Sequence, residues 1–338
     1  MVRHPSITTR RGALAAAMMA AAFAAAGRDA EATCGSANCF LVTGTQEGVG
    51  SKGSLIVDLS YRYIDQSRRL SGTREVAHVL TPKVDFETGL LVPDHHEEIR
   101  TQNTLVEVDL AYGLSERLTL AAALPLVNDR FHEHFDDADT PAPTFTNQDG
   151  SSGFGDVRLG ARYAFVVKTK DILVGGLAVK LPTGSYRLLD SEGAINEPTI
   201  QPGTGSTDLI ASLHYAHQVV PMRVEYFLAG SYRRNRENSL DYRFGDETVL
   251  NLGLDAGAGE RVSWSVQLNG RRVARDAFLG GDVPSTGSTT VNLTPGLRVK
   301  GGKDASVYAF VQVPVYEKVN ETNLAPRYGL LLGVSKVF

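Results

Sequence analysis

Two short stretches concentrate the side chains that could bind a metal ion. Asp94-His95-His96-Glu97-Glu98 is the first, and the second is Phe131-His132-Glu133-His134-Phe135-Asp136-Asp137. Imidazole and carboxylate groups together suit a divalent ion held between neighbouring segments. However, His-x-His is common in polar connections, and no fixed spacing relates the two stretches. We therefore interpret both as solvated loops, and we expect no metal site and no cofactor.

A second set of reactive side chains alternates with apolar residues, most clearly between Gly153 and Pro182. Two arms flank a turn at Lys168–Asp171, and in each arm every second residue is apolar. Alternation with a period of two predicts strands and not helices. Both arms exceed the usual strand of about five or six residues. They reach the roughly 9–11 residues of a tilted membrane-spanning strand.

The same alternation predicts twelve strands after residue 53. They lie at about 54–64, 103–113, 117–128, two within 153–182, then 205–217, 222–234, 246–256, 260–271, 288–300, 304–316 and 325–338. Short and long connections alternate, and the longest are 65–102 and 129–154. Outer-membrane barrels have short periplasmic turns and longer external loops. The sequence therefore predicts an all-β fold, a closed transmembrane antiparallel β-barrel of about twelve strands over residues 54–338.

One face of most predicted strands is charged, and this face should line a lumen. The predicted pore-lining residues are Asp58, Arg62, Glu107, Asp109, Asp156, Arg158, Arg162, Lys180, Asp208, Arg223, Glu225, Asp255, Arg261 and Arg298, with Arg233 and Arg271 on the same faces. Barrels of eight strands are filled by side chains, whereas sixteen strands leave an open channel. With twelve strands, these charges could brace the barrel in pairs or form a constriction that selects permeants.

The N-terminal residues have the features of a signal peptide, which we assign to 1–32. Arg3, Arg10 and Arg11 precede an apolar run from Ala13 to Ala26, and a small-x-small site follows at Ala30–Ala32. Residues 33–53 would then form a periplasmic N-terminal segment or a small plug. Cys34 and Cys39 are the only cysteines. An oxidising periplasm favours a disulfide between them.

Three Gly-rich blocks carry a resemblance to a known family. Gly153-Phe-Gly-Asp156, Leu181-Pro-Thr-Gly184 and Gly203-Thr-Gly-Ser-Thr-Asp208 resemble recurrent blocks of the family labelled "putative MetA-pathway of phenol degradation". The resemblance is clearest over about 150–215. It implies an outer-membrane β-barrel and the passage of aromatic or other apolar small molecules. Glycine and proline at strand ends are features of barrel architecture, so the blocks do not identify a substrate.

Taken together, these features favour an outer-membrane channel that passes small molecules by passive diffusion. The net charge of −4 shows no basic excess that would suggest nucleic acid. No Gly-x-x-x-x-Gly-Lys-Ser/Thr motif is present. The alternatives are a structural or assembly barrel and an outer-membrane lipid hydrolase. For the hydrolase, Ser212 and His214 are the nearest pair, but both should face the lumen and not the lipid. We therefore expect no enzyme.

The C-terminal strand should carry an assembly signal. Counting back by twos from Phe338 gives a face that is apolar except at Lys336 and ends at Tyr328. This resembles the terminal aromatic signal by which the barrel assembly machinery recognises outer-membrane barrels. The last strand must also pair with the first, because an unpaired edge is not tolerated in lipid. The expected partners are therefore outer-membrane lipid, the assembly machinery and a small permeant.

Overall fold

The computed structural model describes residues 48–221, 223–301 and 304–338. The predicted signal peptide, Cys34 and Cys39, and most of the segment 33–53 lie outside the described residues. Within the described ranges, no helix is long and apolar enough to cross a membrane.

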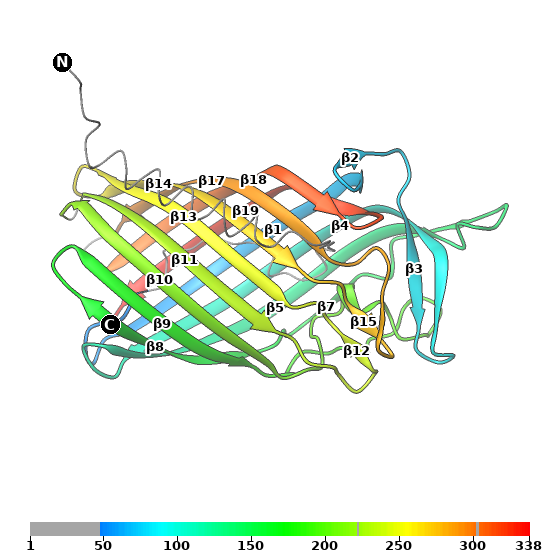
Figure 1. The fold of residues 1–338 in the computed structure, drawn as a ribbon, viewed down its shortest axis with the longest axis horizontal. Coiled ribbons are helices and arrows are strands. Elements are labelled where there is room, and N and C mark those ends of the chain that lie inside the picture. Colours follow the sequence, from blue (N-terminus) through cyan, green and yellow to red (C-terminus); the bar gives the residue numbers. More distant parts are fainter. Residues whose placement is uncertain (1–47, 222, 302–303) are drawn as a thin grey trace, which may run out of the picture. The chain divides into compact units, whose positions relative to one another are not determined.

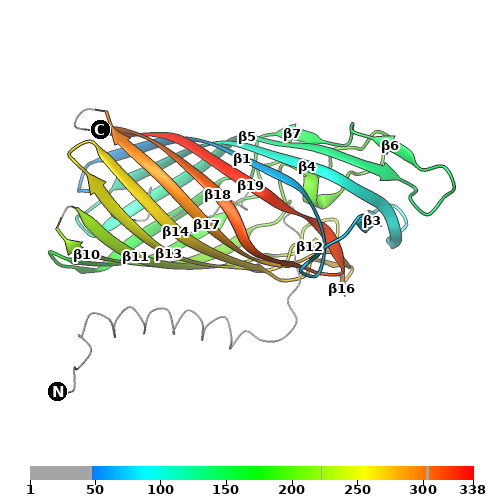
Figure 2. The ribbon, with the colours of Figure 1, turned by 90° about the horizontal axis from the view of Figure 1, so that it is seen from above.

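Twelve long antiparallel strands form a closed barrel, which confirms the predicted fold class (Figures 1 and 2). Each pairs with the next along the chain, and β1 pairs with both β4 and β19, which closes the sheet. The strands are β1 (Leu55–Ser71), β4 (Leu90–Gly113), β5 (Leu118–Asp136), β8 (Arg158–Val167), β9 (Asp171–Lys180), β10 (Asp208–Val220), β11 (Val224–Arg234), β13 (Glu247–Ala258), β14 (Val262–Val273), β17 (Ser288–Lys300), β18 (Ala305–Val319) and β19 (Thr322–Val337).

Strand alternation separates the two faces of the wall. On β9, Leu177 points outward and is 72% exposed, and on β8, Leu159 is 47% exposed. Arg162 pairs with Gly176, one position from the pair Ala161–Leu177, so Arg162 and Leu177 lie on opposite faces. Aromatic rings lie on the outer face where its apolar stretch ends, including the pairs Tyr63–Tyr328 and Tyr163–Phe165. The outer face is therefore apolar with aromatic margins, as a lipid-facing surface requires.

The two ends of the barrel differ in the length of their connections. Short turns and the C-terminus lie at one end, which we call the turn end (Figure 1). Longer connections lie at the other, the loop end, with β3 (Leu80–Asp85), β6 (Thr144–Thr146), β7 (Ser151–Gly153) and the 3-10 turn η2 (Pro198–Ile200). The remaining short strands there are β2 (Arg74–Glu75), β12 (Tyr242–Arg243), β15 (Ala277–Phe278) and β16 (Gly281–Asp282).

The loop end has its own small apolar core. Tyr242, Phe278, Val84 and Val283 are buried against one another, with Phe86 packed on them. Tyr242 and Phe278 belong to the separate sheet of β12, β15 and β16, whereas Val84 belongs to β3. This core joins three connections of the chain, so they hold one another in place.

The prediction of long loops at 65–102 and 129–154 was wrong over much of their length. β1 runs on to Ser71, β4 begins at Leu90, and β5 runs to Asp136, so both histidine-rich stretches lie on paired strands. Backbone pairing continues as far as Glu97 opposite Phe135. Hydrophobic alternation stops earlier because the outward side chains of β4 also become polar beyond Val106, so the apolar pattern under-reports strand length.

The described end of the N-terminal segment lies against the turn end of the wall. The Gly50 N–H donates to the Thr119 hydroxyl at 2.9 Å, and the Gly53 N–H donates to the Gly113 carbonyl at 2.7 Å. A side chain at residue 113 would collide with the Ser51 carbonyl, so glycine is required for this approach. The chain thus enters β1 already hydrogen-bonded to β4 and β5.

The orientation of the wall can be tested with two substitutions on neighbouring strands. We expect Leu177→Arg to abolish assembly, because arginine on the lipid face costs about 2–4 kcal/mol near the membrane midplane. Arg162→Leu is the matched control on the inner face, and it should still give a folded barrel. The measurement is the amount of heat-modifiable folded protein in isolated outer membranes. The opposite result would show that the strand register is reversed.

Candidate functional site

A single carboxylate on β4 holds two arginines inside the barrel. Glu107 is 1% exposed, and its two oxygens face the guanidinium groups of Arg62 on β1 at 2.9 Å and Arg158 on β8 at 2.7 Å. Charge-assisted pairs of this length are the stronger class of hydrogen bond. Arg62 and Arg158 keep side-chain exposures of 19% and 23%, so this cluster borders open space.

Small side chains on β5 allow this contact. β5 lies between β4 and β8, and its inner face has Ala121 and Ala123 at this level. Because neither alanine fills the interior, Arg158 can reach across β5 to Glu107. The small inward side chains of β5 therefore leave room for the contact between Arg158 and Glu107.

A second carboxylate repeats the arrangement on another part of the wall. Glu247 on β13 contacts Arg233 on β11 at 2.8 Å and Arg271 on β14 at 2.5 Å. Sequence analysis placed both arginines on the inner face but missed Glu247. Continuing the alternation back from Asp255 and Asn251 would have reached Glu247, since all three share a face of β13.

A cavity of about 300 Å³ lies between these two clusters. Arg158, Arg162, Arg233, Asp109 and Glu247 line it. Gly160 on β8 and Gly176 on β9 have no side chains to occupy this part of the interior. The lumen is therefore open beside β8–β10 and lined by both signs of charge.

The opposite part of the wall is filled. Tyr308 and Phe310 of β18 form a buried cluster with Ile64 and Leu331. The rings lie over glycines of neighbouring strands, since a Cβ at Gly333 would meet Tyr308 at 2.2 Å and a Cβ at Gly296 would meet Phe310 at 2.0 Å. Aromatic rings thus narrow the lumen from one side and leave the space beside β8–β10.

Next to the aromatic wall, a row of hydrogen-bonded polar side chains occupies the inner faces of β13, β14 and β17. Asn269 donates to Asn251 at 2.9 Å and accepts from the Thr294 hydroxyl at 2.5 Å. Both Asn269 and Thr294 are fully buried. These hydrogen bonds satisfy polar groups that a barrel interior would otherwise leave unpaired.

The three Gly-rich blocks meet at one ion cluster where β8, β9 and β10 reach the loop end. The Lys180 ammonium lies 2.8 Å from both the Asp156 and the Asp208 carboxylates. The backbone N–H groups of Gly184 and Thr204 donate to Asp156 at 3.0 and 2.9 Å. These predicted pore-lining residues are therefore engaged with one another and with loop backbone.

Glycine is required where two of the blocks touch. The backbones of Gly184 and Gly203 approach so closely that a Cβ on residue 203 would lie 2.4 Å from the Gly184 carbonyl oxygen. The Gly203 N–H also donates to the Ser185 carbonyl at 2.8 Å. The blocks thus fasten the connection 181–207 to the ends of the strands.

The remaining predicted pore-lining residues lie at different depths. Asp58 accepts from the Tyr308 hydroxyl at 2.6 Å, and the Arg298 guanidinium lies 4.9 Å from the centre of the Tyr308 ring. Glu225 and Asp255 are register partners at the turn end, where a cavity of about 250 Å³ opens. Two more residues line that cavity from exposed positions in the turns before β11 and β14, namely Arg223 and Arg261.

The candidate hydrolase pair also lies on the inner face. The His214 ring stacks against Phe227 with 5.7 Å between the ring centres. Ser212 lines the 300 Å³ cavity. Both residues therefore lie on the lumen side of β10, away from the lipid-facing surface.

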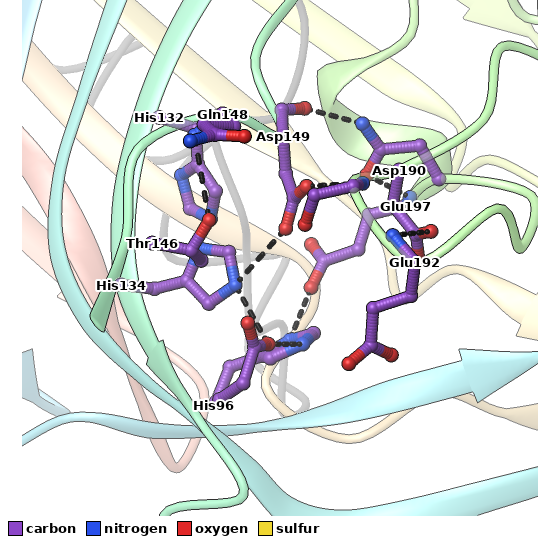
Figure 3. Close-up of polar contacts among 12 residues, drawn as sticks. His96, His132, His134, Thr146, Gln148, Asp149, Asp190, Glu192 and Glu197 are labelled. Atoms are coloured by element: carbon purple, nitrogen blue, oxygen red, sulfur yellow. Dashed lines mark hydrogen bonds and ion pairs between the residues drawn. The ribbon is translucent and has the colours of Figure 1, made fainter. Parts of the chain in front are cut away.

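The second site is a cluster of buried histidines and carboxylates at the loop end (Figure 3). His96 on β4 and His132 and His134 on β5 are each 2–3% exposed, which overturns their interpretation as solvated. Ring centres of His96 and His134, and of His132 and His134, are 4.6 Å apart. Asp149 and Glu197 reach the cluster from the connections after β5 and β9.

This cluster lies beyond the apolar band of the outer wall. The outward residues of β4 are apolar as far as Val106 and become polar at Thr104, Gln102 and Arg100. Arg100 pairs on the outside with Asp65 at 2.9 Å. The cluster is therefore held in an extension of the barrel outside the expected membrane, capped by the loops.

The charged groups of the cluster shift one another's pKa values. Burial by itself would lower the pKa of His96, but the carboxylates of Glu197 and Asp136 raise it to about 10. Burial opposes ionisation of Glu197, yet His96 lowers the pKa of this carboxyl to about 2. Hydrogen bonds from His134 and His96 hold the pKa of Asp136 well below its usual range against the effect of burial.

The sequence pattern pointed to only some of the residues in this cluster. The histidines stood out, but Asp149 and Glu197 lie in irregular connections with no periodicity that could assign them to a site. Only the folding of these connections over the loop end brings them to the histidines.

Comparison with solved structures agrees with this architecture. The COG4313 outer membrane channel from Pseudomonas putida F1 has a TM-score of 0.61 at 15% sequence identity, covering 88% of this chain and 100% of that one. The NanC porin (TM-score 0.42, 9% identity, 83% and 98% covered) and the Ralstonia pickettii toluene transporter TbuX (0.44, 10%, 86% and 90%) are more distant. No curated protein matches the sequence.

The fold and its interior define this protein as a β-barrel of the outer-membrane type. The similarity to the Pseudomonas putida barrel covers nearly the whole described chain and supports this class. More particularly, the chain belongs to the family described as "Putative MetA-pathway of phenol degradation", whose pattern matches residues 72–331. The match includes all three Gly-rich blocks, so the suspected resemblance is confirmed.

The Glu107 cluster makes a stability prediction. We expect Glu107→Gln to lower the free energy of unfolding by about 2–3 kcal/mol, less than a fully buried pair would lose, because Arg62 and Arg158 retain some water. Urea unfolding of the purified protein in lipid vesicles measures this change. Glu260→Gln, at an exposed turn position, is the control and should have little effect. An equal effect of both substitutions would contradict a bracing role for Glu107.

Proposed function

We propose that this protein is a channel in the bacterial outer membrane that passes small molecules down their concentration gradient. The observation that carries the proposal is the cavity of about 300 Å³ in the lumen, bounded by Arg158, Arg162 and Arg233. A barrel with only a structural role in the membrane would not require an open cavity within its lumen. The charges around this space favour selection among permeants by sign and size.

Aromatic compounds are the first class of permeant to test. The family description names phenol degradation, and Arg158, Arg162 and Arg233 line the cavity. The charge of a phenolate or an aromatic carboxylate suits these arginines, and a guanidinium group also attracts the face of an aromatic ring. Transport needs no energy source within the chain, in keeping with the absence of a nucleotide-binding motif. We propose no enzymatic activity.

A structural barrel is the alternative, and the loop end favours it. There, the connections fold inward and leave cavities of only about 70, 50 and 10 Å³. If the loops never opened, the lumen would be a closed space. Conduction measurements separate these two functions.

Removing a lumen arginine should alter conduction. In planar bilayers, we expect the purified wild type to conduct and Arg158→Ala or Arg162→Ala to shift ion selectivity toward cations, because positive charge is lost from the cavity. Arg234→Ala is the control, since Arg234 neighbours Arg233 but is exposed on the other face of β11. Reversal potentials in a salt gradient give the selectivity.

The result against a channel would be equally clear. It would consist of a wild type that never conducts, together with cells lacking the protein that take up all tested aromatic anions at the normal rate. Lack of conduction in both wild type and Arg158→Ala would then support the structural alternative.

Phe338 is proposed to carry the assembly signal. Its ring is 64% exposed, and its backbone exchanges hydrogen bonds with Leu55 at 2.8 and 3.1 Å, next to the closing seam. The Lys336 ammonium lies 4.5 Å from the centre of the Phe338 ring, so its charge is placed near the aromatic margin. This location at the turn end suits recognition by the barrel assembly machinery from the periplasm.

Deleting Phe338 should therefore reduce the folded protein in the outer membrane and leave unfolded chain in the periplasm. Fractionation followed by a heat-modifiability gel measures both pools. Phe338→Tyr keeps a terminal aromatic ring and should assemble like the wild type. If the chain that lacks Phe338 reaches the membrane in wild-type amount, Phe338 is only part of the aromatic margin of the outer face and not an assembly signal.

A further inference from the structure

The histidine cluster at the loop end has the composition of a metal centre. His134, Asp136 and Asp149 offer ligand atoms that all lie within 4.8 Å of one another, and Asp136 also belongs to a second such group with His96. Figure 3 shows His96, His134 and Asp149 facing the same space. We propose that His96, His134, Asp136 and Asp149 bind one divalent transition-metal ion such as Zn²⁺. The proposal is independent of the transport function, since it concerns the capped extension beyond the apolar band and not the lumen.

The contacts that link these donor atoms in sequence have the spacing of neighbouring ligands on one ion. His134 Nε2 lies 2.8 Å from Asp136 Oδ1 and 3.5 Å from Asp149 Oδ2, and His96 Nε2 lies 3.1 Å from the same Asp136 oxygen. Ligands about 2.0–2.1 Å from a tetrahedral zinc ion are roughly 3.3 Å from one another.

Neighbouring groups already orient these ligands. The second nitrogen of His96, Nδ1, faces the Glu197 carboxylate, an arrangement that fixes the ring and strengthens it as a ligand. The second oxygen of Asp149, Oδ1, accepts the Ser191 backbone N–H at 2.7 Å, which leaves Oδ2 directed at His134. The Asn196 side chain also bonds to the Asp149 backbone carbonyl. Such second-layer contacts are typical of metal sites and hold the ligands in place.

Charge supports the presence of a cation. Asp136, Asp149, Glu197 and Glu98 surround the histidines, and burying carboxylates is unfavourable unless opposite charge accompanies them. Lys83 contributes at the edge, 3.7 Å from Asp190. A divalent ion would offset the acidic excess more fully than protonated histidine.

The donor set also indicates the kind of metal. Imidazole nitrogen suits zinc, copper, iron and nickel, whereas calcium and magnesium prefer sites made of oxygen alone. Two nitrogens and two carboxylate oxygens therefore favour a borderline ion, for which Zn²⁺ is the probe. Because imidazole and carboxylate ligands bind a metal ion in their deprotonated forms, affinity should fall as the pH is lowered.

An ion here would fasten a connection to the wall. His96, His134 and Asp136 belong to the paired strands β4 and β5, whereas Asp149 lies in the connection between β6 and β7. Glu197 and Ser191, in the connection after β9, touch the ligands from the other side. Metal binding would thus stabilise both connections in their inward-folded positions.

Zinc titration of the folded, chelator-stripped protein in detergent at pH 7.5 tests the proposal by calorimetry. We expect one Zn²⁺ per chain. Loss of a second-layer carboxylate typically weakens metal sites by about 10–100-fold, and we expect this of Glu197→Gln. His134→Ala and Asp149→Asn remove ligands and should weaken binding at least as much. His217→Ala, on β10 and paired with Asp171, is the control and should bind like the wild type.

A second measurement covers the case in which the ligand variants do not fold. Co²⁺ added to the stripped wild type should give visible absorption bands of a four- or five-coordinate ion, and Zn²⁺ should remove them. Absence of one-to-one Zn²⁺ binding by the folded wild type would overturn the proposal. So would unchanged affinity in folded His134→Ala, and the cluster would then be a metal-free network of His–Asp hydrogen bonds.

Discussion

The pairing of β1 with β19 is the contact on which the rest of the structure depends. A sheet in lipid cannot leave backbone N–H and C=O groups unpaired, so the first and last strands must meet. They do so over nearly their whole length, from Ile56 opposite Val337 to Ser71 opposite Thr322. Closure also determines which side of every strand faces the lumen, because alternation then assigns each residue to one face.

Closure of the barrel brings charged side chains together in its interior, where they must be paired. Charges excluded from the lipid face are concentrated in a narrow lumen, where an unpaired ion is unfavourable. Glu107 and Glu247 each serve two arginines from different strands, and Lys180 serves two aspartates. Small residues and glycines between these clusters leave the space beside β8–β10. Arg158, Arg233 and Glu247, which belong to the bracing clusters, also line this space.

Beyond the apolar band, the barrel wall continues without lipid and the chemistry changes. The inward residues of β4 and β5 become histidines and acids, and the connections fold over them with an apolar core of their own around Tyr242 and Phe278. These groups are shielded from bulk water, so their partners must come from the protein, from ordered water or from a bound ion. The folding of the connections therefore brings carboxylates such as Asp149 and Glu197 to the histidines.

The sequence by itself determined the barrel. Alternation from residue 54 onward specified twelve strands, and it specified which side of β8 and β9 carries Arg162 and which carries Leu177, because the period of a strand is independent of its neighbours. What alternation could not supply was contact across the lumen and between connections. That Glu107 holds Arg158 across β5, that β4 and β5 extend into the histidine stretches, and that Asp149 and Glu197 reach them were decided by the tertiary structure. The physical reason is that barrel closure and loop packing bring these partners together. Neither produces a periodic pattern in the amino-acid sequence.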